Sequence, residues 1–216
     1  MPASSQAHPS PPRDAVDERD ADGSPVGHRE RLIAAMATSI EERGYRDTTV
    51  ADVVRLARTS RRNFYEHFDD RDACFLALFD ATNQEMLEEI EAAVAPDRPL
   101  DDQVDAAVDA YISNVAGHPA LYSSFVRELP GLGDQGAVRG QATLERFAEM
   151  LVGLVDRARE VQPGLVARSL DLDTAIIIVG GLRELLVISL QQRRDLRALR
   201  TNVGRTIKAI LIGTLL

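Results

Sequence analysis

Hydrophobic residues recur at intervals of three and four along most of the chain from residue 29 onward. This spacing is typical of amphipathic helices, which bury one face and expose the other. Strand-like alternation does not recur, and no internal repeat is evident. The pattern therefore predicts an all-α fold, with helices over roughly residues 29–43, 49–57, 60–68, 69–95, 101–117, 118–129, 144–162, 174–192 and 196–214.

Two of the predicted helices are short and lie close together within residues 48–71. Thr49 and Asp52 have the spacing of a capping box at the start of the first. Ser60 can cap the second, in which Phe64 and Phe68 lie one turn apart on one face. Two such helices joined by a turn of about three residues predict a helix-turn-helix, whose second helix reads DNA.

The helical phase of this second helix separates its side chains by direction. With Phe64 and Phe68 facing the core, Arg62 points away from it and Asn63 lies beside Arg62. Arginine suits the paired acceptors of guanine, and asparagine suits adenine. We therefore expect Arg62 and Asn63 to contact bases.

The flanking positions suit the DNA backbone. Arg61, Tyr65 and His67 lie nearer the sides of the helix, where their side chains can bind phosphate oxygens and set the register. The hydroxyl groups of Thr49 and Ser60, at the starts of the two helices, are expected in the same phosphate-contacting set.

The stretch resembles the DNA-binding domain of TetR-family (tetracycline-repressor-like) transcriptional regulators. The matching segments are TTVADVV, SRRNFYEHF and DDRDACF. The resemblance implies a three-helix DNA-binding domain followed by a helical ligand-binding and dimerisation domain, and a phosphate contact from Arg71. The chain departs from the family at Arg58, where glycine is common, so Arg58 is expected to adopt a left-handed conformation.

Composition and charge refine these boundaries. Residues 1–27 are rich in proline and acids and predict a disordered tail, residues 28–75 the helix-turn-helix domain, and residues 76–216 the second domain. The net charge of −9 is at first unexpected for a DNA-binding protein. However, residues 80–109 carry ten acidic residues and one basic residue, whereas residues 29–79 carry nine of each. The acidic excess therefore lies outside the motif.

The C-terminal half carries the features expected of an interface. Residues 130–136, rich in glycine, predict a flexible loop. Residues 173–192 are apolar on nearly all sides, and residues 196–215 show the three- and four-residue spacing of a packing seam. The resemblance implies that these two helices form a four-helix bundle with a second subunit, although a monomeric core would show the same pattern.

The resemblance also implies a small-molecule cavity among the helices of the second domain. Arg183 and Glu184 interrupt an apolar helix, and they can pair across a dimer, reach solvent or hold a polar group of the ligand. The candidate lining residues are Met86, Tyr111, Tyr122, Phe125, Phe147, Met150 and Arg183.

Other classes of protein find little support. The four histidines are dispersed, and no metalloprotease, nucleophile-elbow, phosphate-loop or CxxC motif occurs, so we expect no enzyme, metal or cofactor. The single cysteine, Cys74, and the lack of a signal sequence or spanning segment indicate a cytoplasmic protein. We expect a homodimeric, ligand-responsive repressor that a small molecule releases from a palindromic operator. The alternative is a helical small-molecule or lipid carrier without DNA binding.

Overall fold

The computed structural model describes residues 27–161 and 168–215. No β-strand occurs among these residues, and the predicted all-α fold is confirmed. Residues 1–26, which make up almost all of the predicted tail, and Pro163 and Gly164, which were expected to end a helix, lie outside the described residues.

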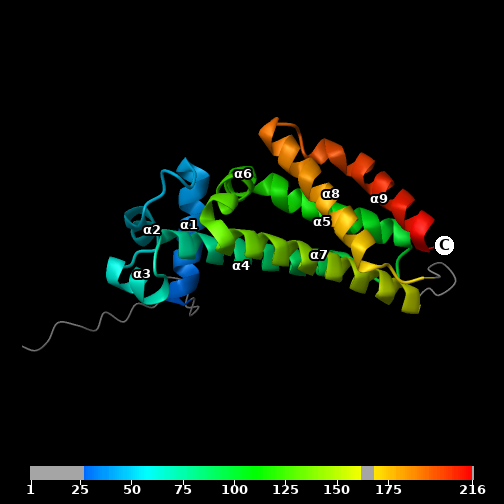
Figure 1. The fold of residues 1–216 in the computed structure, drawn as a ribbon, viewed down its shortest axis with the longest axis horizontal. Helices are drawn as coiled ribbons and strands as arrows, with labels where there is room; N and C mark the ends of the chain where they lie inside the picture. Colours follow the sequence, from blue (N-terminus) through cyan, green and yellow to red (C-terminus); the bar gives the residue numbers. More distant parts are fainter. Residues whose placement is uncertain (1–26, 162–167, 216) are drawn as a thin grey trace, which may run out of the picture.

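Three helices form a head at one end of the molecule (Figure 1). The first buries Leu32, Met36 and Ile40 and ends at Gly44, whose φ of 81° and N–H bond to the Ile40 carbonyl (2.8 Å) confirm the predicted stop. Phe64, fully buried, packs its ring against that of Phe68, 5.7 Å away. The three helices are α1 (His28–Arg43), α2 (Val50–Leu56) and α3 (Arg61–His67).

Helix α4 (Arg71–Ala93) joins the head to the rest of the molecule (Figure 1). It starts at Asp70, whose carboxylate accepts the Ala73 N–H at 2.7 Å. The expected domain boundary after residue 75 falls inside this continuous helix. Burial raises the pKa of the Cys74 thiol in α4 to about 12, as expected of a small buried side chain.

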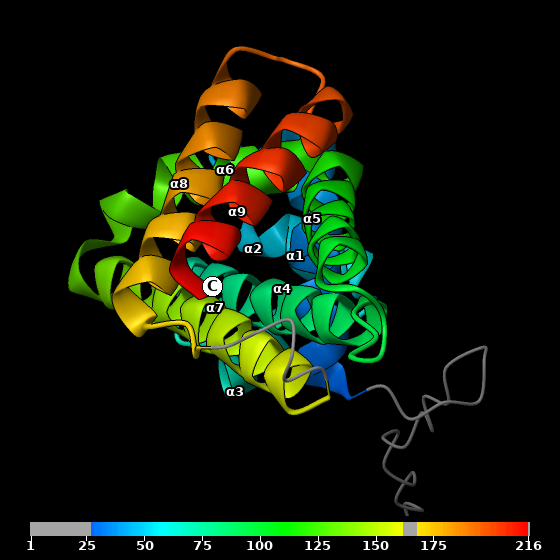
Figure 2. The same cartoon turned by 90° about the vertical axis from the view of Figure 1, so that its right-hand side faces the viewer.

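The remaining helices form the body, in which α5 lies beside α9, and α4 and α7 lie beneath α8 and α9 (Figure 2). Helix α8 packs on α7, and α9 packs on α5. The elements are α5 (Leu100–Gly117), α6 (Pro119–Glu128), the 3-10 turn η1 (Leu129–Leu132), α7 (Gly133–Val161), α8 (Leu172–Gln191), η2 (Arg197–Leu199) and α9 (Arg200–Leu215).

The glycine-rich segment at residues 130–136 is not a loop, so this prediction was wrong. It forms η1 and the first turn of α7. Gly133 supplies a φ of 63° at the junction. At Gly136 a Cβ would lie 2.0 Å from the carbonyl oxygen of Leu129. The glycines therefore allow two helices to meet closely. A glycine-rich composition is the same for such a close junction and for a flexible loop, so the sequence did not distinguish them.

Ion pairs connect the head to the body. Arg46 donates from Nε to both carboxylate oxygens of Glu128 at 3.0 and 3.2 Å, which joins the turn after α1 to the end of α6. Nearby, Nδ1 of His118 lies 2.5 Å from the carboxylate of Glu41. Together with α4, these contacts place α6 directly against the head.

Candidate nucleic-acid interface and effector cavity

The capping box predicted for α2 is present. The Thr49 hydroxyl accepts the Asp52 N–H at 3.2 Å, and the Asp52 carboxylate accepts the Thr49 N–H at 3.1 Å. The Thr49 hydroxyl also donates to Asp52 at 2.6 Å. These bonds, with Arg43 nearby, hold the pKa of the Asp52 carboxyl below its usual range. The start of α2 is therefore held by groups that the local sequence supplies.

The turn between α2 and α3 adopts the left-handed conformation expected at Arg58. Its φ is 51°, the Arg58 N–H bonds to the Arg55 carbonyl, and the Thr59 N–H bonds to the Val54 carbonyl. This is a Schellman motif, in which glycine normally takes the left-handed position. The Arg58 side chain is exposed and forms no ion pair with the described residues, so it adds positive charge to the outer surface of the turn.

Helix α3 presents a polar face to solvent. Ser60 caps it as predicted, by accepting the Asn63 N–H at 3.1 Å. The Arg62 side chain is 90% exposed, and its Nε donates to Glu66 at 3.1 Å. Tyr65 is 56% exposed. Arg62 and Tyr65 are thus accessible on the surface of the second helix of the motif.

Asn63 is less free than its neighbour. It is partly buried, and its Nδ2 donates to the Thr59 hydroxyl at 2.7 Å. This bond uses one of the two amide hydrogens and leaves the side-chain carbonyl available. The structure therefore separates Arg62, which is fully presented, from Asn63, which is partly engaged within the turn.

The other expected DNA contacts lie around the same end of the head. Arg61 and His67 are exposed, and the His67 ring stacks with that of His28 at 6.4 Å. Arg71 instead makes contacts inside the head: Nη1 donates to the Thr48 carbonyl at 3.1 Å, and the guanidinium lies 4.2 Å from the Tyr45 ring centre. Tyr45, which also bonds Asp72, is an anchor that sequence reasoning missed, signalled only by an aromatic residue after the helix end.

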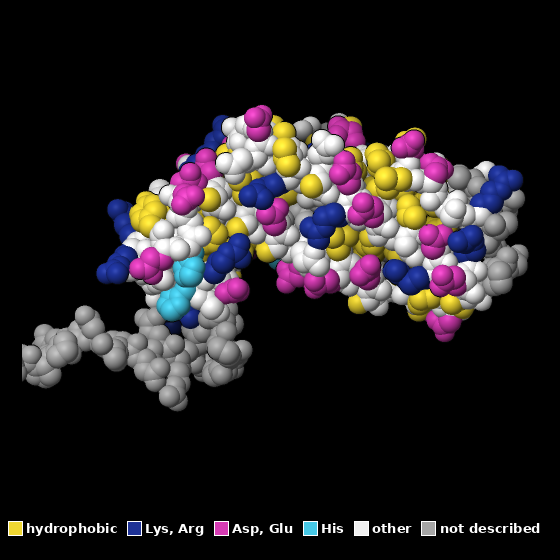
Figure 3. Space-filling model, turned by 60° about the horizontal axis from the view of Figure 1, so that its bottom comes forward, with side chains coloured by type: hydrophobic (Ala, Val, Ile, Leu, Met, Phe, Trp, Pro, Cys, Tyr) yellow, Lys and Arg dark blue, Asp and Glu magenta, His cyan; other side chains and the backbone are white. Residues whose placement is uncertain are grey.

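The charge distribution agrees with DNA contacts at this end of the head. Figure 3 shows basic side chains at the outer end of the head with acidic ones among them, and acidic side chains mixed with basic ones along the body. Backbone contacts need only a local positive surface, so the overall charge of −9 does not oppose DNA binding by the head.

The family model described as "Bacterial regulatory proteins, tetR family" matches residues 32–78, which span α1 to the first part of α4. The head therefore carries a domain of the TetR family. Its helix-turn-helix is accordingly a DNA-binding motif. A comparison with curated proteins finds no match.

Solved structures of TetR-family proteins share the whole fold. A TetR-family regulator of Mesorhizobium loti is 16% identical, with a TM-score of 0.70 over 86% of this chain and 95% of the other. FadR of Bacillus subtilis, in complex with stearoyl-CoA, is 20% identical, with a TM-score of 0.67 over 84% and 96% of the two chains. At these identities the likeness concerns the fold.

Two small cavities lie among the helices of the body. One, of about 70 Å³, is lined by Met150 and aliphatic residues, and the other, of about 100 Å³, by Tyr122, Phe125 and Arg183. Tyr111, Phe147 and Val179 line both. Six of the seven expected lining residues are thereby brought together, whereas Met86 is buried in the core and lines neither cavity.

The polar groups of the second cavity are few. Burial raises the pKa of Tyr111 to about 12, against the opposing effect of the Arg183 charge. The Tyr122 hydroxyl donates to Asn114 at 2.5 Å, and Asn83 donates to the Phe79 carbonyl at 2.7 Å. Asn83 also lines this cavity but escaped prediction, because an isolated amide in a helix gives no recognisable pattern. Arg183 and Glu184 are exposed in the single chain.

Among the described residues, no group of histidine, cysteine and acidic side chains could hold a metal ion. The helices of residues 27–161 and 168–215 are also too short or too polar to cross a membrane.

Proposed function

We propose that the protein is a homodimeric transcriptional repressor that binds a palindromic operator and leaves it when a small molecule enters the body. The observation that carries the proposal is α3, a helix capped by Ser60 and anchored by Phe64 that presents Arg62 and Tyr65 to solvent. It lies in a domain that matches the TetR family model. Residues 28–75 act as the DNA-binding unit and residues 76–216 as the regulatory unit.

Arg62 and Asn63 contact bases in the proposed complex. The Arg62–Glu66 pair is exposed on both sides, so solvent already screens it and exchange for guanine costs little. Asn63 reads adenine after its bond to Thr59 is broken, or uses its free carbonyl and second hydrogen. Arg62 therefore contributes more to base discrimination than Asn63.

Thr49, Ser60, Arg61, Tyr65, His67 and Arg71 contact phosphates in the same proposal. Arg61, Tyr65 and His67 are exposed around α3, which supports this assignment. Arg71 already bonds the Thr48 carbonyl, so it contributes partly by holding the start of α4 against the turn before α2.

An exposed apolar stripe on α8 supports the dimer. Ile177, Gly181 and Ile188 lie on one helical face at spacings of four and seven residues, and Glu184 is the one charged residue between them on that face. Ile177 is 68% exposed, Ile188 is 39% exposed, and a Cβ at Gly181 would meet no atom within 4 Å. A second copy that covers this stripe through residues 173–192 and 196–215 would bury it and place two copies of α3 about one or more DNA turns apart, roughly 34 Å.

The effector enters the two cavities on either side of Tyr111 and Phe147. Their rings meet edge to face at 5.8 Å, and the cavities of about 70 and 100 Å³ are smaller than those that hold drug-sized ligands, about 300 Å³ or more. These rings must therefore move. The mainly aliphatic first cavity suits an apolar chain, and the stearoyl-CoA bound by FadR of Bacillus subtilis supports that class of effector.

The test is binding to DNA from the protein's own upstream region. Arg62→Ala is expected to weaken operator binding by about 1 to 3 kcal/mol and to relax base preference, and Tyr65→Phe to weaken binding evenly across sequences. Val138→Ala, on the exposed surface of α7, serves as the control. Binding without sequence or salt dependence would refute the regulator.

The effector part is tested separately with stearoyl-CoA and stearate. Release of DNA that Tyr111→Ala or Phe147→Ala abolishes, with DNA affinity retained, would support the cavity assignment. Ligand binding by a chain that does not bind DNA at all would instead indicate the carrier.

A further inference from the structure

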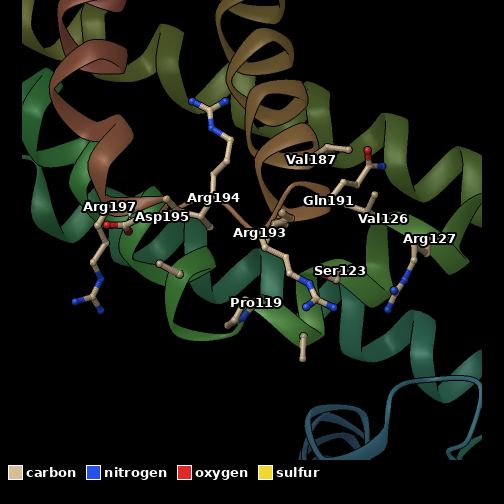
Figure 4. Close-up of a pocket in the computed structure, with 14 residues that line it drawn as sticks. Pro119, Ser123, Val126, Arg127, Val187, Gln191, Arg193, Arg194, Asp195 and Arg197 are labelled. Atoms are coloured by element: carbon tan, nitrogen blue, oxygen red, sulfur yellow. Dashed lines mark hydrogen bonds between the residues drawn. The ribbon is translucent and has the colours of Figure 1, made fainter.

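A separate cleft lies between α6, the end of α8 and η2, away from the two cavities described above (Figure 4). Its volume is about 710 Å³, within the range of small-molecule sites. Four arginines and a single carboxylate line it. The basic residues are Arg127, Arg193, Arg194 and Arg197, and the acid is Asp195.

These arginines lack partners within the described chain. None of the four forms an ion pair or side-chain hydrogen bond there, whereas Arg46, Arg139 and Arg200 elsewhere are paired with carboxylates. One carboxylate oxygen of Asp195 is used locally, because it accepts the Arg197 N–H at 3.0 Å. Guanidinium groups that line one cleft with so little counter-charge would be stabilised by an anion.

Two of the four arginines are directed toward the same part of the cleft. Figure 4 shows Arg127 of α6 and Arg193 of the turn after α8 on either side of Ser123, with Arg194 and Arg197 directed elsewhere. Two guanidinium groups and a hydroxyl suit the oxygens of a phosphate group.

Arg193 takes this position at a conformational cost. Its φ is 53°, its N–H bonds to the Leu190 carbonyl at 3.1 Å, and the Arg194 N–H bonds to the Ser189 carbonyl at 2.9 Å. This is a second Schellman motif with arginine at the position that favours glycine. This backbone strain at Arg193 is explained if arginine is kept there for its side chain and not for the conformation of the turn.

The rest of the lining indicates what the anion carries. Apolar side chains from α5, α6 and α8 form the wall beside the arginines, so a bare inorganic ion would leave this surface in contact with water. They are Ala116, Pro119, Ala120, Val126, Val187 and Leu190. We propose that this cleft binds a small organic phosphate, with the phosphate between Arg127 and Arg193 and the apolar or aromatic part of the molecule against this wall.

The first experiment titrates the full chain with inorganic phosphate, inorganic pyrophosphate and adenosine monophosphate by calorimetry, at constant ionic strength. Saturable binding of pyrophosphate and adenosine monophosphate is expected, with adenosine monophosphate binding more tightly than inorganic phosphate because its base packs on the apolar wall. Equal affinities would overturn the organic part of the proposal, and unsaturable binding that salt alone abolishes would show an adventitious ion only and overturn the site.

Variants then assign the site. Arg127→Gln and Arg193→Gln are each expected to weaken pyrophosphate binding by about tenfold or more, because each removes a charged two-point contact. Arg194→Gln and Arg197→Gln are matched controls with the same charge loss, expected to change it by less than about threefold. Equal losses of pyrophosphate affinity in all four variants would show that only the overall positive charge matters, and would overturn the site. Arg127 lies on the exposed surface of α6, so Arg127→Gln still tests the site if the Arg193 variant does not fold.

A last measurement distinguishes a small ligand from DNA. In phosphate-free buffer, the two variants are expected to bind upstream DNA as tightly as the unchanged chain. Arg61→Ala, which removes a proposed phosphate contact, is measured alongside. A loss of DNA affinity as large as in Arg61→Ala would assign these arginines to DNA phosphates and overturn the proposal.

Discussion

Arg58 and Arg193 are the two non-glycine residues with positive φ in the described part of the chain. Both occupy the left-handed position of a Schellman motif after a helix, at the turn to α3 and at the turn to η2. An L-residue in this conformation costs about 1–2 kcal/mol. The exposed guanidinium of Arg193 lies where a small organic phosphate is proposed to bind, whereas that of Arg58 adds positive charge to the turn beside the proposed DNA contacts.

Replacing Arg58 by glycine is expected to stabilise the folded protein. Relief of the left-handed strain outweighs the larger unfolded-state entropy of glycine by about 0.5 kcal/mol. Urea unfolding of Arg58→Gly measures the gain, and Arg61→Gly, in the first turn of α3, is the control expected to lose stability. A loss in both variants would show that the turn does not strain Arg58.

The capping box at Asp52 makes the stability of the head depend on pH. Because its bonds to Thr49 lower the pKa of Asp52 in the folded state, they stabilise the fold above the pKa of the unfolded carboxyl. This contribution is lost as the pH falls through the lowered folded pKa. Urea unfolding at pH 7 should therefore show Asp52→Asn less stable than the unchanged chain, and the difference should shrink toward pH 3. A constant difference would contradict this linkage.

At the scale of elements, the junction of η1 and α7 depends on close backbone approach rather than on side chains. Gly136 lies so near the Leu129 carbonyl that any side chain would displace one of the two segments. The same junction continues α6, which holds Glu128 against Arg46 of the head. A change at Gly136 is therefore expected to disturb both the packing of α7 and the contact between body and head.

Gly136→Ala is expected to destabilise the fold by about 1–3 kcal/mol, because the added Cβ overpacks a backbone contact. Gly140→Ala is the matched control one turn later: its Cβ would meet Leu129 Cδ2 at an ordinary 3.5 Å, and alanine favours the helix. Thermal unfolding of both variants measures the contrast. Equal stability would mean that η1 shifts without cost.

At the scale of the whole molecule, the head and body form an elongated chain with α8 and α9 on one side (Figure 1). The α8 stripe at Ile177 and Ile188 is exposed, although it continues the apolar pattern of a buried helix. A single chain thus leaves uncovered the surface that the proposed dimer would bury.

Ile177→Glu is expected to convert a micromolar dimer into monomers, because an unpaired charge in the interface costs about 2 kcal/mol or more. Val138→Glu provides a matched control, since Val138 is 65% exposed on α7 and lies outside the stripe. Sedimentation measures both. A dimer that persists in Ile177→Glu, or a monomer in the unchanged chain, would refute the α8 interface.

The sequence by itself determined the helical class, the starts of α2 and α3 and the stop at Gly44. These features depend on groups within about five residues of one another, such as the Thr49–Asp52 capping box, and are visible in local order. The family resemblance added the left-handed conformation at Arg58. It also added the expectation of a ligand-binding and dimerisation domain.

Only the tertiary structure decided which distant groups meet. It paired Arg46 with Glu128, used the Arg71 side chain inside the head, and turned the glycine-rich segment into a helix junction. It left Met86 in the core while placing Tyr111 at two cavities, and it brought Arg127 and Arg193 to one cleft from distant parts of the chain. Such contacts depend on how helices cross and pack, and local periodicity carries no record of that geometry.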